Sequence, residues 1–260
     1  MSLDLGTDQL HAHVEGPIGW ICFNNPGRHN ALSREMLAAL PRAVQALETD
    51  DAVRVVVMRG AGERAFVSGA DLRQVEGFRG VRPRASEAWG GALSELEKPL
   101  IAMIHGWCLG GGLLTALWAD LRVAAEDARF GIPAAKLGVG YPYDSTQALL
   151  AAVGPAAASE ILLTGGQFDA RDALRLGLVN RVVPKAELEA EVTKLARTIA
   201  GNAPLTLRAA KACIRDGLRE PAERRREECE KLVERCWASE DFREGRLAFA
   251  EKREPRFQAR

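Results

Sequence analysis

The sequence predicts an α/β protein in which helices cover the faces of a sheet. Three observations support this fold class. Over the first two thirds of the 260 residues, short β-rich runs alternate with helical stretches. Two of the strand-like runs lead through glycines into a helical stretch. From Pro184 onward the β pattern stops, and only helical stretches follow.

The strands are expected where apolar and β-branched residues cluster, at residues 18–23, 53–59, 100–104 and 121–124. Between the first two, residues 33–49 predict a helix with Ser33 as its N-cap. Its apolar residues share one face: Met36, Leu37, Leu40, Val44 and Leu47. Pro41 lies inside this run, so we expect a kink or a late start there.

Three helices are expected in the last third, at residues 185–201, 205–217 and 222–237. Asn-Ala-Pro and Arg-Glu-Pro separate them. The charged run at residues 223–230 mixes both signs, which is typical of a solvated helix face rather than of a nucleic-acid site.

The composition excludes several classes of protein. Lys plus Arg and Asp plus Glu both number 35, so no excess of positive charge is available to bind nucleic acid. A hydrophobic fraction of 47% excludes a disordered scaffold. The five cysteines are scattered without a Cys-x-x-Cys pair, so we expect neither a disulfide framework nor a metal site. A reducing, cytoplasmic location fits this cysteine usage best.

Residues 100–119 contain no Asp, Glu, Lys or Arg, which raises the alternative of a membrane span. Three consecutive glycines, 110–112, would weaken such a helix. A buried strand, a glycine turn and a buried helix give the same pattern, and we favour that interpretation. The N-terminus has no basic region followed by an apolar one, so we expect no secretory signal.

Two glycine-containing turns are the most informative segments. In AFVSGADLRQV, residues 65–75, Gly69 permits a backbone conformation closed to other residues, and Asp71 could cap a helix starting at Leu72. Such a turn leaves the Ala70 and Leu72 amides pointing outward. In HGWCLGGGLL, residues 105–114, a strand runs into a helix whose first N–H groups have no partner. Either turn alone could simply permit close packing.

Taken together, the two turns resemble the oxyanion-hole motifs of the crotonase superfamily, the enoyl-CoA hydratase/isomerase family. The resemblance covers nearly the whole chain. Four further segments carry it: NNPGRHNALS (24–33), ADLRVAAEDARFGIP (119–133), LTGGQFDARDALRLGLVNRVVP (163–184) and AFAEKREPRF (248–257). It implies a spiral of ββα turns over residues 1–195 and a helical oligomerisation region at residues 196–260.

The resemblance assigns the Ala70 and Gly111 N–H groups as donors to the thioester carbonyl oxygen of an acyl-CoA. An enolate next to a thioester places negative charge on that oxygen, which two fixed donors stabilise more than the neutral carbonyl. For the CoA, the resemblance indicates Arg28, Ala31 and Ser68. Arg73 is either a phosphate partner or solvated surface.

The sequence departs from a hydratase at the two positions where the family carries catalytic glutamates. Leu114 and Ala134 stand there, and neither side chain can move a proton. Ordinary two-glutamate hydration is therefore not expected. Isomerisation, decarboxylation, hydrolysis or an unusual hydration remain open, as does a catalytically inactive acyl-CoA-binding homologue.

Three residues are candidate acids or bases. Glu87 aligns with a catalytic His of dehalogenases in the family, although a solvated helix residue is the simpler interpretation. Tyr141 matches the Tyr of methylmalonyl-CoA decarboxylases. Asp144 lies in the same loop, where it could instead cap a helix starting at Ser145. We interpret His105 as structural.

The resemblance also sets the expected partners. It implies an acyl-CoA substrate, with CoA as part of that substrate, and no metal or redox cofactor. It further implies a homotrimer or homohexamer, in which Lys252 reaches the CoA of a neighbouring subunit. We expect no nucleic acid and no membrane as partners.

Overall fold

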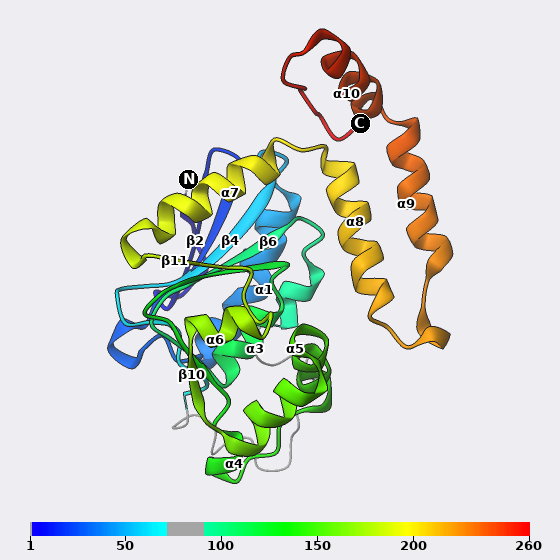
Figure 1. Cartoon of the computed structure of the whole chain (residues 1–260). Helices are drawn as coiled ribbons and strands as arrows, with labels where there is room; N and C mark the ends of the chain where they lie inside the picture. The colour runs from blue at the N-terminus through cyan, green and yellow to red at the C-terminus, as the bar shows by residue number, and fades with distance from the viewer. Residues whose placement is uncertain (1, 72–90) are drawn as a thin grey trace.

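The computed structural model describes residues 2–71 and 91–260, which form two sheets packed with helices (Figure 1). The larger sheet has the order β1-β2-β3-β4-β6-β8-β11 and the smaller one β10-β9-β7-β5. The larger sheet comprises β1 (Ser2–Leu3), β2 (Leu10–Glu15), β3 (Ile18–Phe23), β4 (Val55–Gly60), β6 (Leu100–Ile104), β8 (Leu121–Ala125) and β11 (Arg181–Val183). The smaller sheet comprises β5 (Ala65–Val67), β7 (Trp107–Leu109), β9 (Arg129–Gly131) and β10 (Gln167–Asp169).

The chain visits the two sheets alternately. The pairs β4 and β5, β6 and β7, and β8 and β9 each give one strand to the larger sheet and the next to the smaller one. Strands β3, β4, β6, β8 and β11 are parallel, as are β5, β7 and β9. Helix α1 (Arg34–Thr49) links β3 to β4, and α3 (Gly111–Leu117) links β7 to β8. The structure therefore confirms the expected α/β class and its ββα spiral.

Both faces of the larger sheet are covered, which explains the continuous apolar runs of its strands. All five residues of β6 are buried. One core lies between the sheets and α1, with Phe23, Phe66 and Phe130 among its largest side chains. A second core lies under α7 (Leu188–Ala200), whose Leu188, Val192 and Ala196 are buried against the other sheet face. Parallel strands buried on both sides require apolar residues throughout.

Helix α1 begins where its capping residue predicts. The Ser33 hydroxyl accepts a hydrogen bond from Met36 N at 3.1 Å, and the helix starts at Arg34. Pro41 lies inside the helix, so the expected late start is wrong. The predicted apolar face is buried through Met36, Leu40, Val44 and Leu47, which hold the helix on the sheet.

The uncharged stretch at residues 100–119 is divided among β6, β7 and α3, as the interpretation of a strand, a glycine turn and a helix predicts. One helix in the described part of the chain, α5 (Tyr143–Thr164), is long and apolar enough to cross a membrane by length and composition. Gly154 leaves the helical conformation at φ 76° and ψ 170°, and Pro155 follows it. The segment is therefore two shorter helices joined at a kink.

Between β9 and β11 the chain forms short helices on the side of the smaller sheet. They are α4 (Ala134–Leu137), the kinked α5 and α6 (Ala170–Arg175). Two 3₁₀ turns lie earlier in the chain, η1 (Pro26–Arg28) and η3 (Gly91–Glu95). Figure 1 shows α3, α4, α5 and α6 together below the larger sheet.

The C-terminal third is helical, as predicted. After η4 (Lys185–Glu187) come α7, α8 (Pro204–Gly217), η5 (Pro221–Glu223), α9 (Arg226–Ala238) and α10 (Glu240–Glu251). Helix α7, which spans residue 195, lies on the sheet, whereas α8, α9 and α10 extend to one side of it (Figure 1). Helix α10 is not among the helices that the sequence predicts. It begins at Glu240, and its N-cap is Ser239, whose hydroxyl accepts a hydrogen bond from Phe242 N at 3.0 Å.

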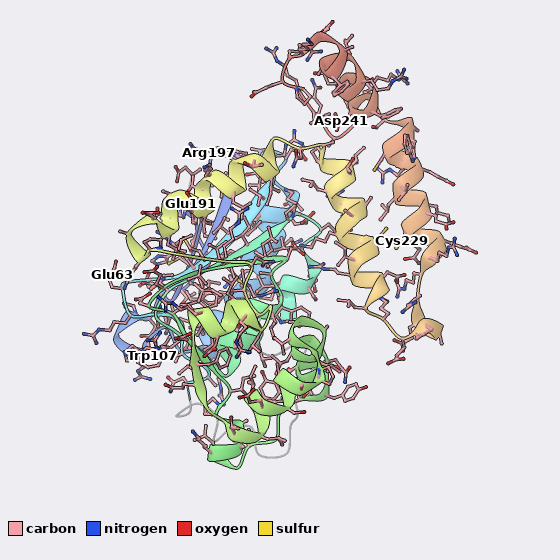
Figure 2. The ribbon with its side chains drawn as sticks, in the orientation of Figure 1. Glu63, Trp107, Glu191, Arg197, Cys229 and Asp241 are labelled. Atoms are coloured by element: carbon pink, nitrogen blue, oxygen red, sulfur yellow. The ribbon has the colours of Figure 1, made fainter. Side chains whose placement is uncertain are left out.

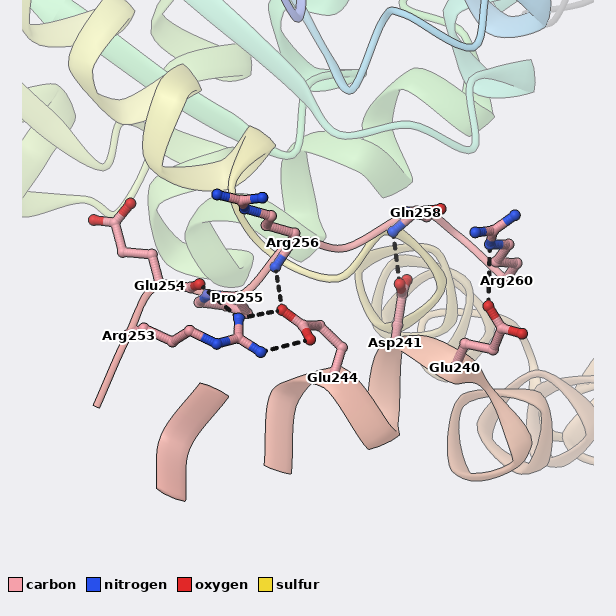
Figure 3. Close-up of a pocket in the computed structure, with 9 residues that line it drawn as sticks. All are labelled: Glu240, Asp241, Glu244, Arg253, Glu254, Pro255, Arg256, Gln258 and Arg260. Atoms are coloured by element: carbon pink, nitrogen blue, oxygen red, sulfur yellow. Dashed lines mark hydrogen bonds and ion pairs between the residues drawn. The ribbon is translucent and has the colours of Figure 1, made fainter. Parts of the chain in front are cut away.

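The last residues fold back onto α10 rather than extending into solvent (Figure 3). The Arg253 guanidinium donates to both Glu244 carboxylate oxygens, at 2.6 and 2.9 Å. The Asp241 carboxylate accepts from the backbone N–H groups of Gln258 and Ala259. These bonds order the chain end against the first turns of α10.

Candidate active site

The first glycine turn follows β5 and is clamped to the loop before α1. Gly69 adopts φ +116°, which other residues rarely adopt. Leu32 N donates to Gly69 O at 2.8 Å, and Asp71 N donates to Leu32 O at 3.0 Å. Among the described residues, no acceptor bonds the half-buried Ala70 N–H. The turn therefore leaves this amide available to a ligand, as its sequence predicts.

The second glycine turn joins β7 to α3. Gly110 has φ 50° and ψ −117°, and its N–H donates to Gly131 O at 2.8 Å. Gly111 is the first residue of α3, where an N–H has no partner within the helix. No acceptor elsewhere in the described ranges takes up that amide. A second donor is thus left open at this turn.

The two turns lie against each other. A Cβ atom placed on Gly69 would be 3.9 Å from Gly111 N and 3.4 Å from Leu109 O. A Cβ atom on Gly112 would be 1.9 Å from Val67 O, so only glycine lets α3 approach β5 this closely. Parallel pairing of β5 with β7 keeps both turns at the same edge of the smaller sheet. The Ala70 and Gly111 amides are therefore brought into one small region.

Three residues that come after the second turn along the chain have apolar or phenolic side chains that pack in the interior. Leu114, on α3, is 5% exposed. Ala134, at the start of α4, packs against the core. Tyr141 also packs there, and no described residue accepts from or donates to its buried hydroxyl oxygen. Burial raises the pKa of Tyr141 far above its usual value, with a smaller contribution from the Cys108 thiol. The phenol is therefore protonated and can only donate a proton.

This geometry agrees with comparisons to known proteins. A sequence model described as "Enoyl-CoA hydratase/isomerase" matches residues 13–260. The chain belongs to the enoyl-CoA hydratase/isomerase family. Crotonyl-CoA hydratase of Syntrophomonas wolfei is 35% identical over 247 residues, which are 94% of this chain and 95% of that protein. Carnitinyl-CoA dehydratase of Proteus mirabilis is 35% identical and covers 98% of this chain and 100% of its own length.

Solved structures give the same result. The crystal structure of an enoyl-CoA hydratase/carnithine racemase from Magnetospirillum magneticum has a TM-score of 0.88 and 36% identity, covering 98% of this chain and 97% of that one. A structure titled as enoyl-CoA hydratase subunit I from Geobacillus kaustophilus has a TM-score of 0.86 and 38% identity, covering 97% and 98%. The crotonase fold and acyl-CoA processing are therefore properties of the family to which this chain belongs.

The residues that the family resemblance assigns to CoA surround the first turn. Arg28 ends η1, and its guanidinium lies 2.6 Å from the buried Asp71 carboxylate. Asp71 thus pairs with Arg28. The Ser68 hydroxyl lies 3.4 Å from Arg28 O, and Ala31 is buried. Arg73 and Glu87 lie outside the described residues, as does the helix expected from Leu72.

Asp144 differs in exposure from Tyr141, whose hydroxyl oxygen is buried. It is exposed and occupies the first turn of α5, which begins at Tyr143 rather than at Ser145. The prediction that Asp144 caps this helix is wrong, because Pro142 is the N-cap residue and makes no side-chain cap. Pro142 O instead accepts from Thr146 N at 2.9 Å. The backbone angles of proline already suit a helix start.

Two other predicted residues lie away from the turns. His105, at the end of β6, is 6% exposed, and burial lowers its pKa, so the ring is neutral. Its Nε2 atom is buried and has no hydrogen-bond partner among the described residues. Lys252 is the C-cap of α10 with φ 54°, on the helical arm that extends from the body (Figure 1).

Sequence reasoning missed Asn30, which holds the loop around Arg28 and Ala31. Asn30 is fully buried, with φ 55°. Its amide donates to Ala61 O at 2.9 Å and to Ala65 O at 2.8 Å, and its oxygen accepts from Asn25 N at 2.9 Å. An Asn just after a Pro-Gly turn is a signal for the left-handed conformation, which Asn tolerates better than most residues.

Proposed function

We propose that this chain is an acyl-CoA enzyme that stabilises a thioester enolate between the Ala70 and Gly111 N–H groups. The observation that carries the proposal is the pair of unsatisfied amides on two touching turns. Removal of one such donor from an oxyanion hole typically costs about 3 to 4 kcal/mol of transition-state stabilisation. Because the donors are backbone groups, the proposal places no demand on the side chains at these positions.

The residues at the acyl end favour a reaction whose enolate forms without a carboxylate base at either glutamate position. Leu114 and Ala134 cannot take a proton, and the Tyr141 phenol can only give one. Loss of CO₂ from a malonyl-type thioester meets this condition. The carboxylate leaves as CO₂, its bonding electrons form the enolate, and Tyr141 then protonates the α-carbon. Water returns the proton to the phenolate. Isomerisation, hydrolysis and an unusual hydration remain alternatives that use other proton carriers.

The experiment is incubation of the pure protein in D₂O with enoyl-, acyl-, aryl- and malonyl-type CoA thioesters, followed by mass spectrometry. Decarboxylation with solvent-derived deuterium at the α-carbon supports the proposal. Tyr141→Phe should then lower the rate by about 100-fold or more. Tyr143→Phe is the matched control, since Tyr143 lies in the same segment but is 72% exposed.

A second candidate function is binding of acyl-CoA without turnover. The apolar residues at both glutamate positions favour it. If every thioester in the panel stays unchanged, and the protein binds CoA in a way that Gly112→Ala abolishes, the binding function is supported and the enzyme function is overturned. If the protein catalyses hydration or isomerisation and Tyr141→Phe leaves the rate unchanged, the proposed enolate chemistry stands, but Tyr141 is not the proton carrier.

We propose a cytoplasmic homotrimer, or a hexamer of two trimers, as the assembled form. Large apolar side chains on α9 and α10 support this assembly: Trp237 is 65% exposed and Phe249 is 88% exposed. Together with Phe242 and Phe257 they surround an apolar groove of about 690 Å³ between α8, α9 and α10. Light scattering coupled to size-exclusion chromatography tests the assembly, and a monomer would overturn it. Cell fractionation tests the location.

A further inference from the structure

Helices α8 and α9 form an antiparallel hairpin whose two halves are held very differently. On α8, Lys211 donates to Lys98 O at 2.6 Å, and Arg215 donates to the carbonyls of Ser94 and Leu96 at 2.9 and 3.0 Å. These bonds fix α8 to the body. Helix α9 contains no buried residue and lies on the outer side of α8 (Figure 1). The position of α9 therefore depends on what joins it to α8 and α10.

The register of the hairpin can be read from the bonds near its turn. Asp216 Oδ1 accepts from Arg225 N at 2.9 Å, and Arg224 donates to Gly217 O at 3.2 Å. Moving one helical turn away from the loop means going back about three residues along α8 and forward about four residues along α9. This step leads from Asp216 and Arg225 to Cys213 and Cys229. The two cysteines therefore face each other across the hairpin.

The side chains agree with this register. The Cys213 and Cys229 thiols lie close enough to interact with each other, and both are free and half-buried. Figure 2 shows Cys229 on the side of α9 that faces α8. Cys229 also lines a polar cavity of about 310 Å³ between α8, α9 and η3, so a small reagent can approach it from that side.

The remaining cysteines are placed differently. Cys236 lies two turns further along α9, and its thiol donates to Leu232 O of the same helix at 3.3 Å. Cys22 and Cys108 are buried within the sheets. Cys236 is therefore a natural control, since it lies on the same helix as Cys229 and is also half-buried, but it does not face Cys213 in the same way.

We propose that Cys213 and Cys229 form a reversible disulfide that ties α9 to α8 when the protein meets a low-molecular-weight disulfide. The Cys229 thiolate attacks one sulfur of the small disulfide and releases one equivalent of small thiol. The Cys213 thiolate then attacks Cys229 Sγ in this mixed disulfide and releases the second equivalent. The two cysteines lose two hydrogens in total, and the small disulfide is reduced to two thiols.

Peptide mapping of the native protein tests the connectivity. The protein is equilibrated in glutathione buffers of increasing oxidised fraction, blocked with a maleimide and digested without reductant. We expect one cross-linked peptide pair, Cys213 with Cys229, that disappears on reduction. Cys236→Ser should form the same pair, whereas Cys213→Ser should retain glutathione on Cys229. A stable glutathione adduct on wild-type Cys229, or a bond to Cys236 or to another chain, would overturn the proposal.

Hydrogen–deuterium exchange tests the mechanical consequence. Closing the loop between residues 213 and 229 removes conformations in which α9 separates from α8. Oxidation should slow amide exchange in residues 226–238 by about tenfold and leave β6 unchanged. Reduction should restore the original rate. Equal exchange of α9 in the two redox states would show that the disulfide does not tie the helices together.

Discussion

Replacement of Asp120 by Asn should destabilise the protein more at neutral pH than at pH 9. Lys211 is the reason, because its side chain is only 6% exposed. Its ammonium donates to Asp120 Oδ2 at 2.7 Å, and the same oxygen accepts from Leu100 N at 2.7 Å. Asn can keep both hydrogen bonds through its amide oxygen. The substitution therefore removes the negative charge and little else.

The size of the effect is set by how easily Lys211 can lose its proton. Burial lowers the pKa of Lys211 to about 8, with Asp120 opposing this change. At pH 7 the ammonium is one unit below that pKa, so deprotonation costs about 1.4 kcal/mol. The part of the lost free energy that comes from Lys211 is limited to this amount, because the lysine can become neutral instead of staying charged. The limit is about 2.7 kcal/mol at pH 6 and close to zero at pH 9.

The sign of the pH dependence follows from the same pKa. The folded protein holds the Lys211 proton more weakly than the unfolded chain, whose lysine pKa is 10.5. This group therefore makes the free energy of unfolding rise between about pH 8 and pH 10.5 in the wild type. In Asp120→Asn the pKa of Lys211 in the folded protein should be lower still, so the free energy of unfolding should begin to rise at a lower pH.

Urea unfolding at pH 6, 7 and 9 measures these differences, with Lys211→Met as the second arm of a double-mutant cycle. In the Lys211→Met background, Asp120→Asn should lose its pH-dependent effect. A destabilisation that is equal at all three pH values, or a pH-dependent one that persists without Lys211, would refute the reasoning.

Three further predictions concern the elements that position the site. Gly112→Ala places a Cβ 1.9 Å from Val67 O, so it should cost about 1 to 3 kcal/mol and abolish acyl-CoA binding. Gly217→Ala, which meets no atom within 4 Å, is its control in thermal unfolding and titration with CoA thioesters. Asn30→Ala removes three hydrogen bonds of a buried amide and should cost about 3 kcal/mol in urea unfolding. Unchanged stability would exclude its role in holding the loop. Ser33→Ala should cost about 1 kcal/mol by loss of the α1 cap, whereas Ser33→Asp should retain most of it in the same assay.

Much of the fold can be predicted because local signals and burial agree. The Ser33 cap, the apolar face of α1 and the two glycine turns each predict a feature that the structure contains. The start of α5 could not be predicted in the same way, since both Pro142 and Asp144 are acceptable near a helix start. Only the packing of the chain selects Pro142 as the N-cap. Helix α10 was missed because Ser239 interrupts a continuous helical pattern with a new cap.

The candidate site was predictable to the extent that it consists of backbone. Glycines mark the turns directly, and the family resemblance then selects the Ala70 and Gly111 amides among the N–H groups of these turns. The state of Tyr141 does not, because its raised pKa depends on burial beside core residues distant in sequence. The role of Asn30 depends likewise on carbonyls some thirty residues further along the chain, at Ala61 and Ala65.

The main-chain origin of the two donors also affects how this gene can change. Every residue except proline carries an N–H group, so most missense mutations at codons 70 and 111 leave a donor in place. Missense mutations are damaging instead at Gly112, which takes no part in the proposed chemistry but has no space for a side chain. Substitutions at Leu114 and Ala134 are free of this constraint. Under the proposed function, drift at those two codons can exchange one reaction for another while the proposed pair of donors is passed on unchanged.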